Sequence, residues 1–120
     1  SGEKLHFIQT YLFTEGDAKG EAMFAKLQET FPEIKTMADV TPATGIANAY
    51  DAMLLLAAAI DKAGSTDGPA IRQAMYEIEN IEGLIKTYTD PFSPEDQDAI
   101  APEDYVFAHF VEGEIIPIKD

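Results

Sequence analysis

The sequence predicts an α/β protein with the element order β-α-α-α-β-β-β. Residues 43–63 form a long apolar segment with the spacing of a helix, and residues 69–79 form a shorter amphipathic one. Segments 5–13 and 105–111 are rich in aromatic and β-branched residues, which favour strands. The length of 120 residues is typical of one domain, and a hydrophobic content of 46% is ordinary for a globular protein.

The first predicted strand, 5–13 (LHFIQTYLF), alternates along its length, yet both of its faces are largely apolar. We therefore expect a strand that is covered on both sides. A turn follows at 14–17, and Asp17 is suited to N-cap a helix that runs to Thr30. Pro32 ends this helix, because the residue before a proline avoids helical angles.

The helix at 43–63 is apolar nearly all round. Leu55, Leu56, Ala58 and Ala59 occupy much of the surface outside its core face. Such a helix must be covered on several sides, and few elements in 120 residues can do so. We therefore expect the chain to be part of a larger fold, or a subunit that needs a partner. The predicted core face consists of Ile46, Tyr50, Met53, Leu54, Ala57 and Ile60.

Asp51 interrupts this apolar helix. An aspartate is unfavourable in the middle of a helix, and an unpaired buried carboxylate is costly. Asp51 therefore either faces solvent or bonds to a partner from another segment, and we favour the structural partner. Its neighbour Tyr50 is interpreted as a core ring with a bonded hydroxyl.

After Gly64, which suits the C′ position, Asp67 is predicted to cap a helix with Pro69 in its first turn. This helix should end near Glu79–Asn80. The remaining elements are then a short strand at 84–88, an acidic loop at 90–104, and a hairpin of strands 105–111 and 114–118 around the Glu112–Gly113 turn, with Pro117 on an edge strand.

Composition excludes several classes of function. The formal net charge of −14, from 22 acidic and 8 basic residues, argues against nucleic acid or an anionic membrane surface as a partner. The absence of cysteine excludes disulfides, thiolate metal sites and cysteine nucleophiles. The longest uninterrupted apolar run, 52–60, is shorter than a bilayer span. Ser1-Gly2 resembles a cleaved tag, so 1–4 is interpreted as a lead-in and 5–120 as the folded segment.

No pattern predicts catalysis. The chain has no GxSxG motif and no glycine-rich phosphate loop, so we expect no enzyme, no catalytic residues and no cofactor. The acidic loop at 90–104 lacks the spacing of a calcium-binding loop and is interpreted as solvated. His6 and His109 are the only histidines and lack metal-ligand spacing, so we expect ordinary strand histidines and no metal site.

Three stretches occur in an order typical of one family: ANAYDAMLLLAAAIDKAGSTDGPAIRQAM, then IEGLIKTYTDPFSPEDQDAI, then DYVFAHFVEGEIIPI. The chain resembles the C-terminal part of type I periplasmic substrate-binding proteins, of the branched-chain amino acid-binding family that feeds ABC importers. The resemblance covers roughly 5–118. Lys86 stands where that family commonly has glycine, and Gln97 where it commonly has histidine.

The resemblance implies a partial Rossmann-like, three-layer αβα fold, in which 5–13 and 84–88 are crossover strands between two lobes and 105–118 is the closing hairpin. The segments that bind an amino acid's carboxylate and ammonium in the family have no counterpart in this sequence. The loop before the AYDA helix approaches the ligand in the family, which implies three ligand-binding residues: Thr44, Gly45 and Ile46.

The function implied is capture of an amino acid or similar small carboxylate by lobe closure, followed by docking on a membrane permease at the periplasmic or extracellular face of a bacterial cell. As an isolated fragment the chain should form a homodimer. Two alternatives stay open: a ligand-sensing domain of a receptor or regulator with the same fold, and a self-associating module without a ligand.

Overall fold

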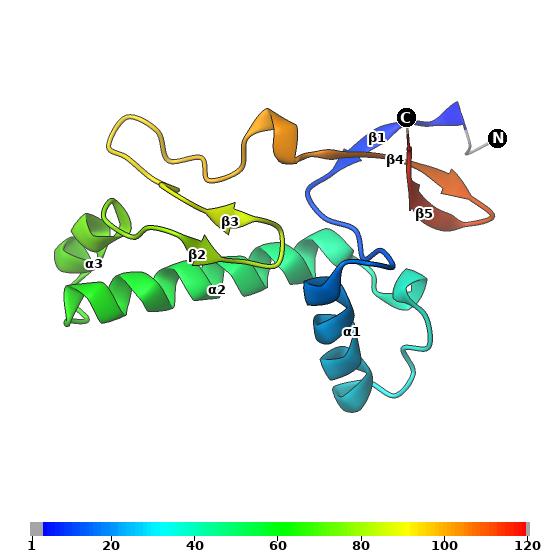
Figure 1. The fold of residues 1–120 in the computed structure, drawn as a ribbon, viewed down its shortest axis with the longest axis horizontal. Coiled ribbons are helices and arrows are strands. Elements are labelled where there is room, and N and C mark those ends of the chain that lie inside the picture. Colours follow the sequence, from blue (N-terminus) through cyan, green and yellow to red (C-terminus); the bar gives the residue numbers. More distant parts are fainter. Residues whose placement is uncertain (1–3, 120) are drawn as a thin grey trace. The chain divides into compact units, whose positions relative to one another are not determined.

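The computed structural model describes residues 4–119. The chain combines helices with small antiparallel sheets, so it is of the α/β class that the sequence predicts (Figure 1). It divides into two compact units. Unit 1 consists of the residues up to Ile46 together with those from Tyr105 onward, and unit 2 consists of Ala47–Asp104.

Unit 1 contains a three-stranded antiparallel sheet of order β1-β4-β5. Its strands are β1 (Phe7–Gln9), β4 (Val106–Val111) and β5 (Glu114–Pro117). The predicted hairpin turn is confirmed, because Glu112 and Gly113 join β4 to β5 with φ angles of 52° and 91°, as a tight hairpin requires. The buried hydrophobic residues of unit 1 are Tyr11, Phe13, Val40 and Ala108.

The predicted first strand is shorter than expected, and the expectation that it is covered on both sides is wrong. Leu5 is 58% exposed and Ile8 is 54% exposed. Beyond β1 the chain leaves the sheet. There the rings of Tyr11 and Phe13 are buried and pack edge to face, with their centroids 5.1 Å apart.

The first helix, α1 (Ala18–Thr30), begins directly after Asp17, as predicted. The Asp17 side chain does not cap α1, however, and its Oδ2 accepts a 2.8 Å hydrogen bond from the Tyr11 hydroxyl. Gly20 lies against the same pair, since a Cβ there would be 2.5 Å from the Tyr11 oxygen. A short 3₁₀ helix, η2 (Met37–Asp39), precedes the second helix.

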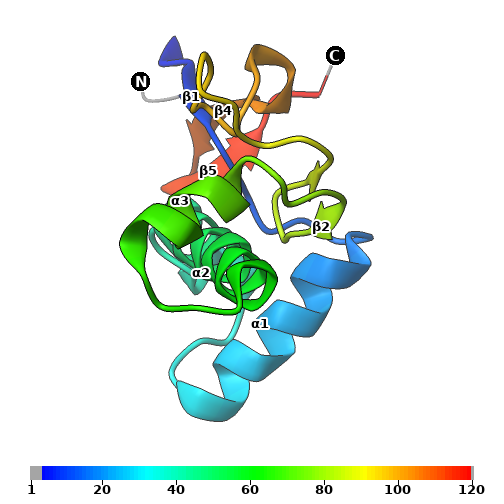
Figure 2. The same cartoon turned by 90° about the vertical axis from the view of Figure 1, so that its left-hand side faces the viewer.

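Unit 2 is built on the long helix α2 (Ala43–Ala63), whose turns from Ala47 onward belong to this unit. The helix α3 (Gly68–Met75) lies beside the C-terminal turns of α2 (Figure 2). Both predicted end signals are confirmed: Gly64 has a φ of 60°, and the Asp67 side chain accepts a hydrogen bond from the Ala70 amide. The central buried cluster of unit 2 consists of Leu55, Ala59, Ala74, Ile78 and Tyr88, and Ala47 and Leu84 are also buried in this unit.

The face of α2 that is buried differs from the predicted one. The predicted core residues Tyr50 and Met53 are 40% and 64% exposed, and Leu56 is 39% exposed. A helix with apolar side chains all round has no single face that periodicity can identify. The buried residues lie four apart and carry mostly small side chains, which lets neighbouring backbone approach: Ala47, Asp51, Leu55 and Ala59.

Among the described residues, the helix α2 is long and apolar enough to cross a membrane, judged by length and composition alone. The sequence did not predict this, because its longest uninterrupted apolar run, 52–60, has nine residues. Core helices of soluble proteins meet the same criteria. Asp51, near its middle, is hydrogen-bonded to other residues of unit 2, as expected for a helix packed against protein.

The strand predicted at 84–88 is wrong in most of its length. The chain forms a hairpin of β2 (Ile81–Glu82) and β3 (Thr87–Tyr88), with a turn closed by the 2.9 Å bond from the Gly83 amide to the Lys86 carbonyl. Unit 2 therefore has two short strands where one was expected. The third helix also ends earlier than predicted, at Met75, and the chain turns before it reaches Asn80, whose φ is 55°.

Candidate functional site

The three residues that the family resemblance suggests for ligand binding lie together in the first turn of α2. Thr44 and Ile46 are half-buried, and Gly45 is exposed. The turn is held by the 3.3 Å hydrogen bond from the Ile46 amide to the carbonyl oxygen of Pro42. A Cβ on Gly45 would lie 3.1 Å from the Pro42 ring, so this turn is closely packed on one side.

The most elaborate polar site of the described residues is in unit 2, around Asp51. Its side chain is 2% exposed, and among residues 4–119 it is the one charged side chain that is buried. Oδ1 accepts a 2.5 Å hydrogen bond from the Leu84 amide, and Oδ2 accepts a 2.9 Å bond from the Ile85 amide. The prediction that Asp51 has a structural partner is thus confirmed, whereas the prediction that Tyr50 is a core ring is wrong.

Tyr88 completes the Asp51 site. Its hydroxyl donates a 2.7 Å hydrogen bond to Oδ2 of Asp51, and its ring is 3% exposed. Burial raises the pKa of the Tyr88 phenol, and the hydrogen bond to Asp51 raises it further. The phenol therefore stays protonated and remains a donor well into the alkaline range.

Gly83 allows this arrangement to form. A Cβ on Gly83 would lie 2.5 Å from Oδ2 of Asp51 and 2.6 Å from the Tyr88 ring, so no larger residue fits without displacing one of them. The backbone amides that follow can then approach the carboxylate, much as consecutive amides enclose a bound anion. Here the anion is supplied by the protein's own helix α2.

The chemistry available at Asp51 follows from these contacts. Three donors are directed at its two oxygens, and water is excluded. A carboxylate that is to act as a general base or as a metal ligand needs an open approach to the substrate or ion. Because the donors leave Asp51 no such open approach, its role is structural. It joins the middle of α2 to the β2–β3 hairpin, which lies beside the helix in Figure 1.

Lys86, which departs from the pattern of the family that the sequence resembles, also has a partner. Its ammonium forms an ion pair with Asp104, which in turn accepts a 2.8 Å hydrogen bond from the Ala101 amide. The hydrogen bond from Lys86 is the main cause that lowers the pKa of Asp104. The ion pair connects the β2–β3 turn to the 3₁₀ helix η3 (Pro102–Asp104), at the end of the acidic loop.

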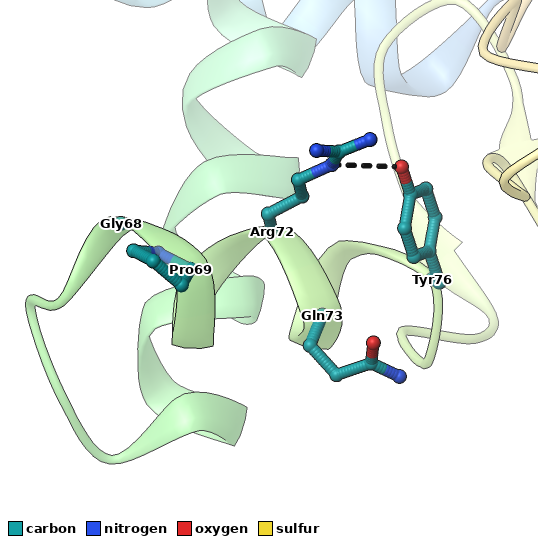
Figure 3. A pocket seen from close by; sticks show the side chains of 5 residues that line it. All are labelled: Gly68, Pro69, Arg72, Gln73 and Tyr76. Carbon is teal, nitrogen blue, oxygen red and sulfur yellow. Dashed lines mark hydrogen bonds between the residues drawn. The ribbon is translucent and has the colours of Figure 1, made fainter.

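An open pocket of about 530 Å³ runs along α3, and none of the predicted ligand-binding residues lines it. Figure 3 shows the Arg72 guanidinium, whose Nε donates a 3.1 Å hydrogen bond to the Tyr76 hydroxyl. All the lining residues come from this one helix and the residue after it, so no second element encloses a ligand. They are Gly68, Pro69, Arg72, Gln73 and Tyr76.

The two histidines lie near opposite ends of the sequence and come together in unit 1. The His6 and His109 rings are 6.1 Å apart between centroids and lie at 81° to each other. Sequence spacing could not reveal this pair, because it depends on the pairing of β1 with β4. Within residues 4–119, no group of three or more histidine and acidic side chains is arranged to hold a metal ion.

The sequence identified the AYDA aspartate as unusual but did not identify its partners. The only local signal was the glycine of IEGLIKTY, which is compatible with a close approach of backbone. In comparisons with known proteins, no family model, no curated protein and no solved structure matches the chain.

Proposed function

We propose that this chain is the C-terminal portion of a solute-binding protein of an ABC importer, with a partial Rossmann-like, three-layer αβα fold. The whole protein would capture an amino acid or a similar small carboxylate between two lobes, and its closed form would dock on a membrane permease. Binding and hinge motion perform this function, without bond chemistry.

The observation that carries the proposal is the Asp51 site. The sequence resemblance rests on separate motifs, and two of them are ANAYDAM and EGLIKTY. Hydrogen bonds from Leu84, Ile85 and Tyr88 of the second motif converge on Asp51 of the first. The two motifs are therefore parts of one structural unit, which gives a physical reason for their occurrence together in one chain.

The proposal assigns different roles to the two ends of α2. The Asp51 site fixes the β2–β3 hairpin on the helix, so it is a structural element of the lobe. The first turn, with Thr44, Gly45 and Ile46, would meet the solute. The hydroxyl of Thr44 and the amides of Thr44 and Gly45 are groups that suit a carboxylate, because amides at a helix start favour negative charge.

Solute binding by the full-length native protein tests this proposal. Calorimetry with a panel of the common amino acids and small carboxylates should find at least one that binds saturably. Thr44→Ala should weaken that binding about tenfold, as expected for the loss of one hydrogen bond to a charged group. Thr66→Ala, at an exposed threonine, is the matched control and should leave binding unchanged.

Two results would contradict the proposal. One is a full-length protein that binds none of these solutes. The other is a native reading frame in which no segment precedes this chain. A fused signalling domain in the native protein would instead favour a ligand-sensing receptor or regulator with the same fold.

A second proposal, that the isolated chain forms a homodimer, rests on the exposed apolar side chains of α2. Tyr50, Met53 and Leu56 lie at successive spacings of three, along one side of the helix. Exposed side chains of this kind, grouped on one helix, mark surfaces that other protein covers. In the full-length protein other segments would cover this side, whereas in the isolated chain a second copy would do so.

A further inference from the structure

The pairing of β1 with β4 places two imidazoles on one face of the sheet of unit 1. Phe7 lies opposite Ala108, so the next position along the register brings His6 opposite His109. Residues directly opposite in an antiparallel pair project from the same face of a sheet. The centroid separation of 6.1 Å between the two rings agrees with this placement.

We propose that His6 and His109 form a two-imidazole site for a divalent transition-metal ion, with Cu²⁺ the tightest-binding of the common ions. Both residues are accessible to an ion, because His6 is exposed and His109 is half-buried. Imidazole nitrogen suits copper, nickel and zinc, and the general order of affinity among these ions favours Cu²⁺.

The distance between the rings fits a shared ion. With metal–nitrogen bonds of about 2.0 Å, two imidazoles on one ion have centroids from about 4.5 Å apart, when they are adjacent ligands, to about 6.4 Å, when they are opposite ones. The observed 6.1 Å lies within this range. Rotation of the exposed His6 side chain brings the rings closer without a change in the strand pairing.

The neighbouring side chains and the net charge of the chain together favour a cation that binds imidazole nitrogen. The next pair on this face, Ile8 and Phe107, is apolar and exposed, so these neighbours offer no carboxylate ligand. Ca²⁺ and Mg²⁺, which require oxygen ligands, therefore gain nothing here. The net charge of −14 attracts cations to the whole molecule. The two protein ligands leave the other coordination positions of the ion to water or to a small ligand.

Titration of the whole chain with CuCl₂ at neutral pH, followed by calorimetry and electron paramagnetic resonance, tests the site. We expect one bound Cu²⁺ with two imidazole nitrogens in its coordination shell. His6→Asn and His109→Asn should each weaken Cu²⁺ binding about 100-fold. Each variant leaves one imidazole and loses the increase in affinity that arises when two ligands of one chain bind the same ion. NiCl₂ and ZnCl₂ should bind more weakly than CuCl₂, and MgCl₂ should not compete.

The double variant Asp96→Asn/Asp98→Asn is the matched control, since it removes two exposed carboxylates of the acidic loop and leaves both histidines. It should bind Cu²⁺ like the unaltered chain. The ion should also raise the melting temperature of the unaltered chain, because it joins β1 to β4 only when the sheet is folded. His109→Asn should lose that rise.

Three results would overturn the proposal. The first is binding of Cu²⁺ by His109→Asn within threefold of the unaltered chain, which would place the ion elsewhere. The second is a loss of binding confined to His6→Asn, which would show a local site near the start of the chain. The third is a resonance spectrum with a single imidazole nitrogen, which can be recorded on the unaltered chain even if a variant fails to fold.

Discussion

The Tyr88 hydroxyl donates a 2.7 Å hydrogen bond to the Asp51 carboxylate across 37 positions of sequence, and both side chains are almost completely buried. A buried carboxylate is tolerated only when it is fully hydrogen-bonded. Two backbone amides of the β2–β3 turn supply the other bonds. The turn and the helix therefore depend on each other, and variants on either side should be destabilising.

Asp51→Ala should lower the free energy of unfolding by about 3 kcal/mol, because it leaves buried donors of Leu84, Ile85 and Tyr88 without an acceptor. Asp61→Ala, at an exposed position of the same helix, is the matched control and should change stability by no more than about 0.5 kcal/mol. Urea unfolding followed by circular dichroism measures both. Equal stabilities of the two variants would show that the Asp51 contacts contribute nothing.

Gly83→Ala should destabilise the chain by about 1–3 kcal/mol through overpacking against Asp51 and Tyr88. Gly68→Ala is the control, since no atom lies within 4 Å of the added methyl group and α3 begins there. It should be neutral within about 0.5 kcal/mol. Thermal unfolding followed by circular dichroism measures both variants. If Gly83→Ala has the same melting temperature as the unaltered chain, the close approach of the turn to α2 does not occur in solution.

Tyr88→Phe removes one bond to Asp51 and should cost about 1.5–3 kcal/mol near neutral pH. Tyr50→Phe, at an exposed ring, is the control and should change little.

The same variant tests the alkaline limit of stability. In the folded chain the pKa of Tyr88 lies above its reference value of 10.0, so the folded state retains a proton that the unfolded state loses. The stabilisation is complete below about pH 10 and is lost as the pH rises beyond it. The unaltered chain should lose stability between about pH 10 and 11 more steeply than Tyr88→Phe. Parallel pH profiles would contradict the raised pKa.

The isolated chain should be a dimer at moderate salt, and Met53→Lys should shift it toward the monomer. Met53 is the most exposed of the large apolar residues of α2, and a charge there would be buried in the interface. Lys62→Met, at an exposed position of the same helix, is the charge-changing control. Light scattering that gives a 13.1 kDa monomer for the unaltered chain at high concentration would refute self-association.

The parts of the fold that local chemistry determines were predictable from the sequence. Asp67 and Gly64 mark helix ends, and Glu112–Gly113 forms a hairpin turn. Each of these features could be predicted because it depends on a few adjacent residues. The buried face of α2 was not predictable, since Met53 and Leu55 are both apolar, yet Met53 is 64% exposed and Leu55 is buried by tertiary packing.

The candidate sites divide in the same way. Asp51 was identifiable as a residue that needs a partner, but its partners lie 33 to 37 positions away and depend on the turn at Gly83. The predicted strand at 84–88 became a hairpin for the same reason, because the Leu84 and Ile85 amides bond to Asp51 rather than to a neighbouring strand. The pairing of His6 with His109 requires the register of β1 on β4, which no local pattern encodes.

Calorimetry with leucine and related amino acids, on this 120-residue chain and on the full-length native protein in parallel, tests the proposed function most directly. The full-length protein should bind one of these solutes saturably. On the proposed function, the 120-residue chain should show no binding, because the resemblance implies that the carboxylate-binding and ammonium-binding segments have no counterpart in it. Each such charged hydrogen bond contributes about 1.5–3 kcal/mol. Micromolar binding of leucine to the 120-residue chain, or no binding by the full-length protein, would contradict the account.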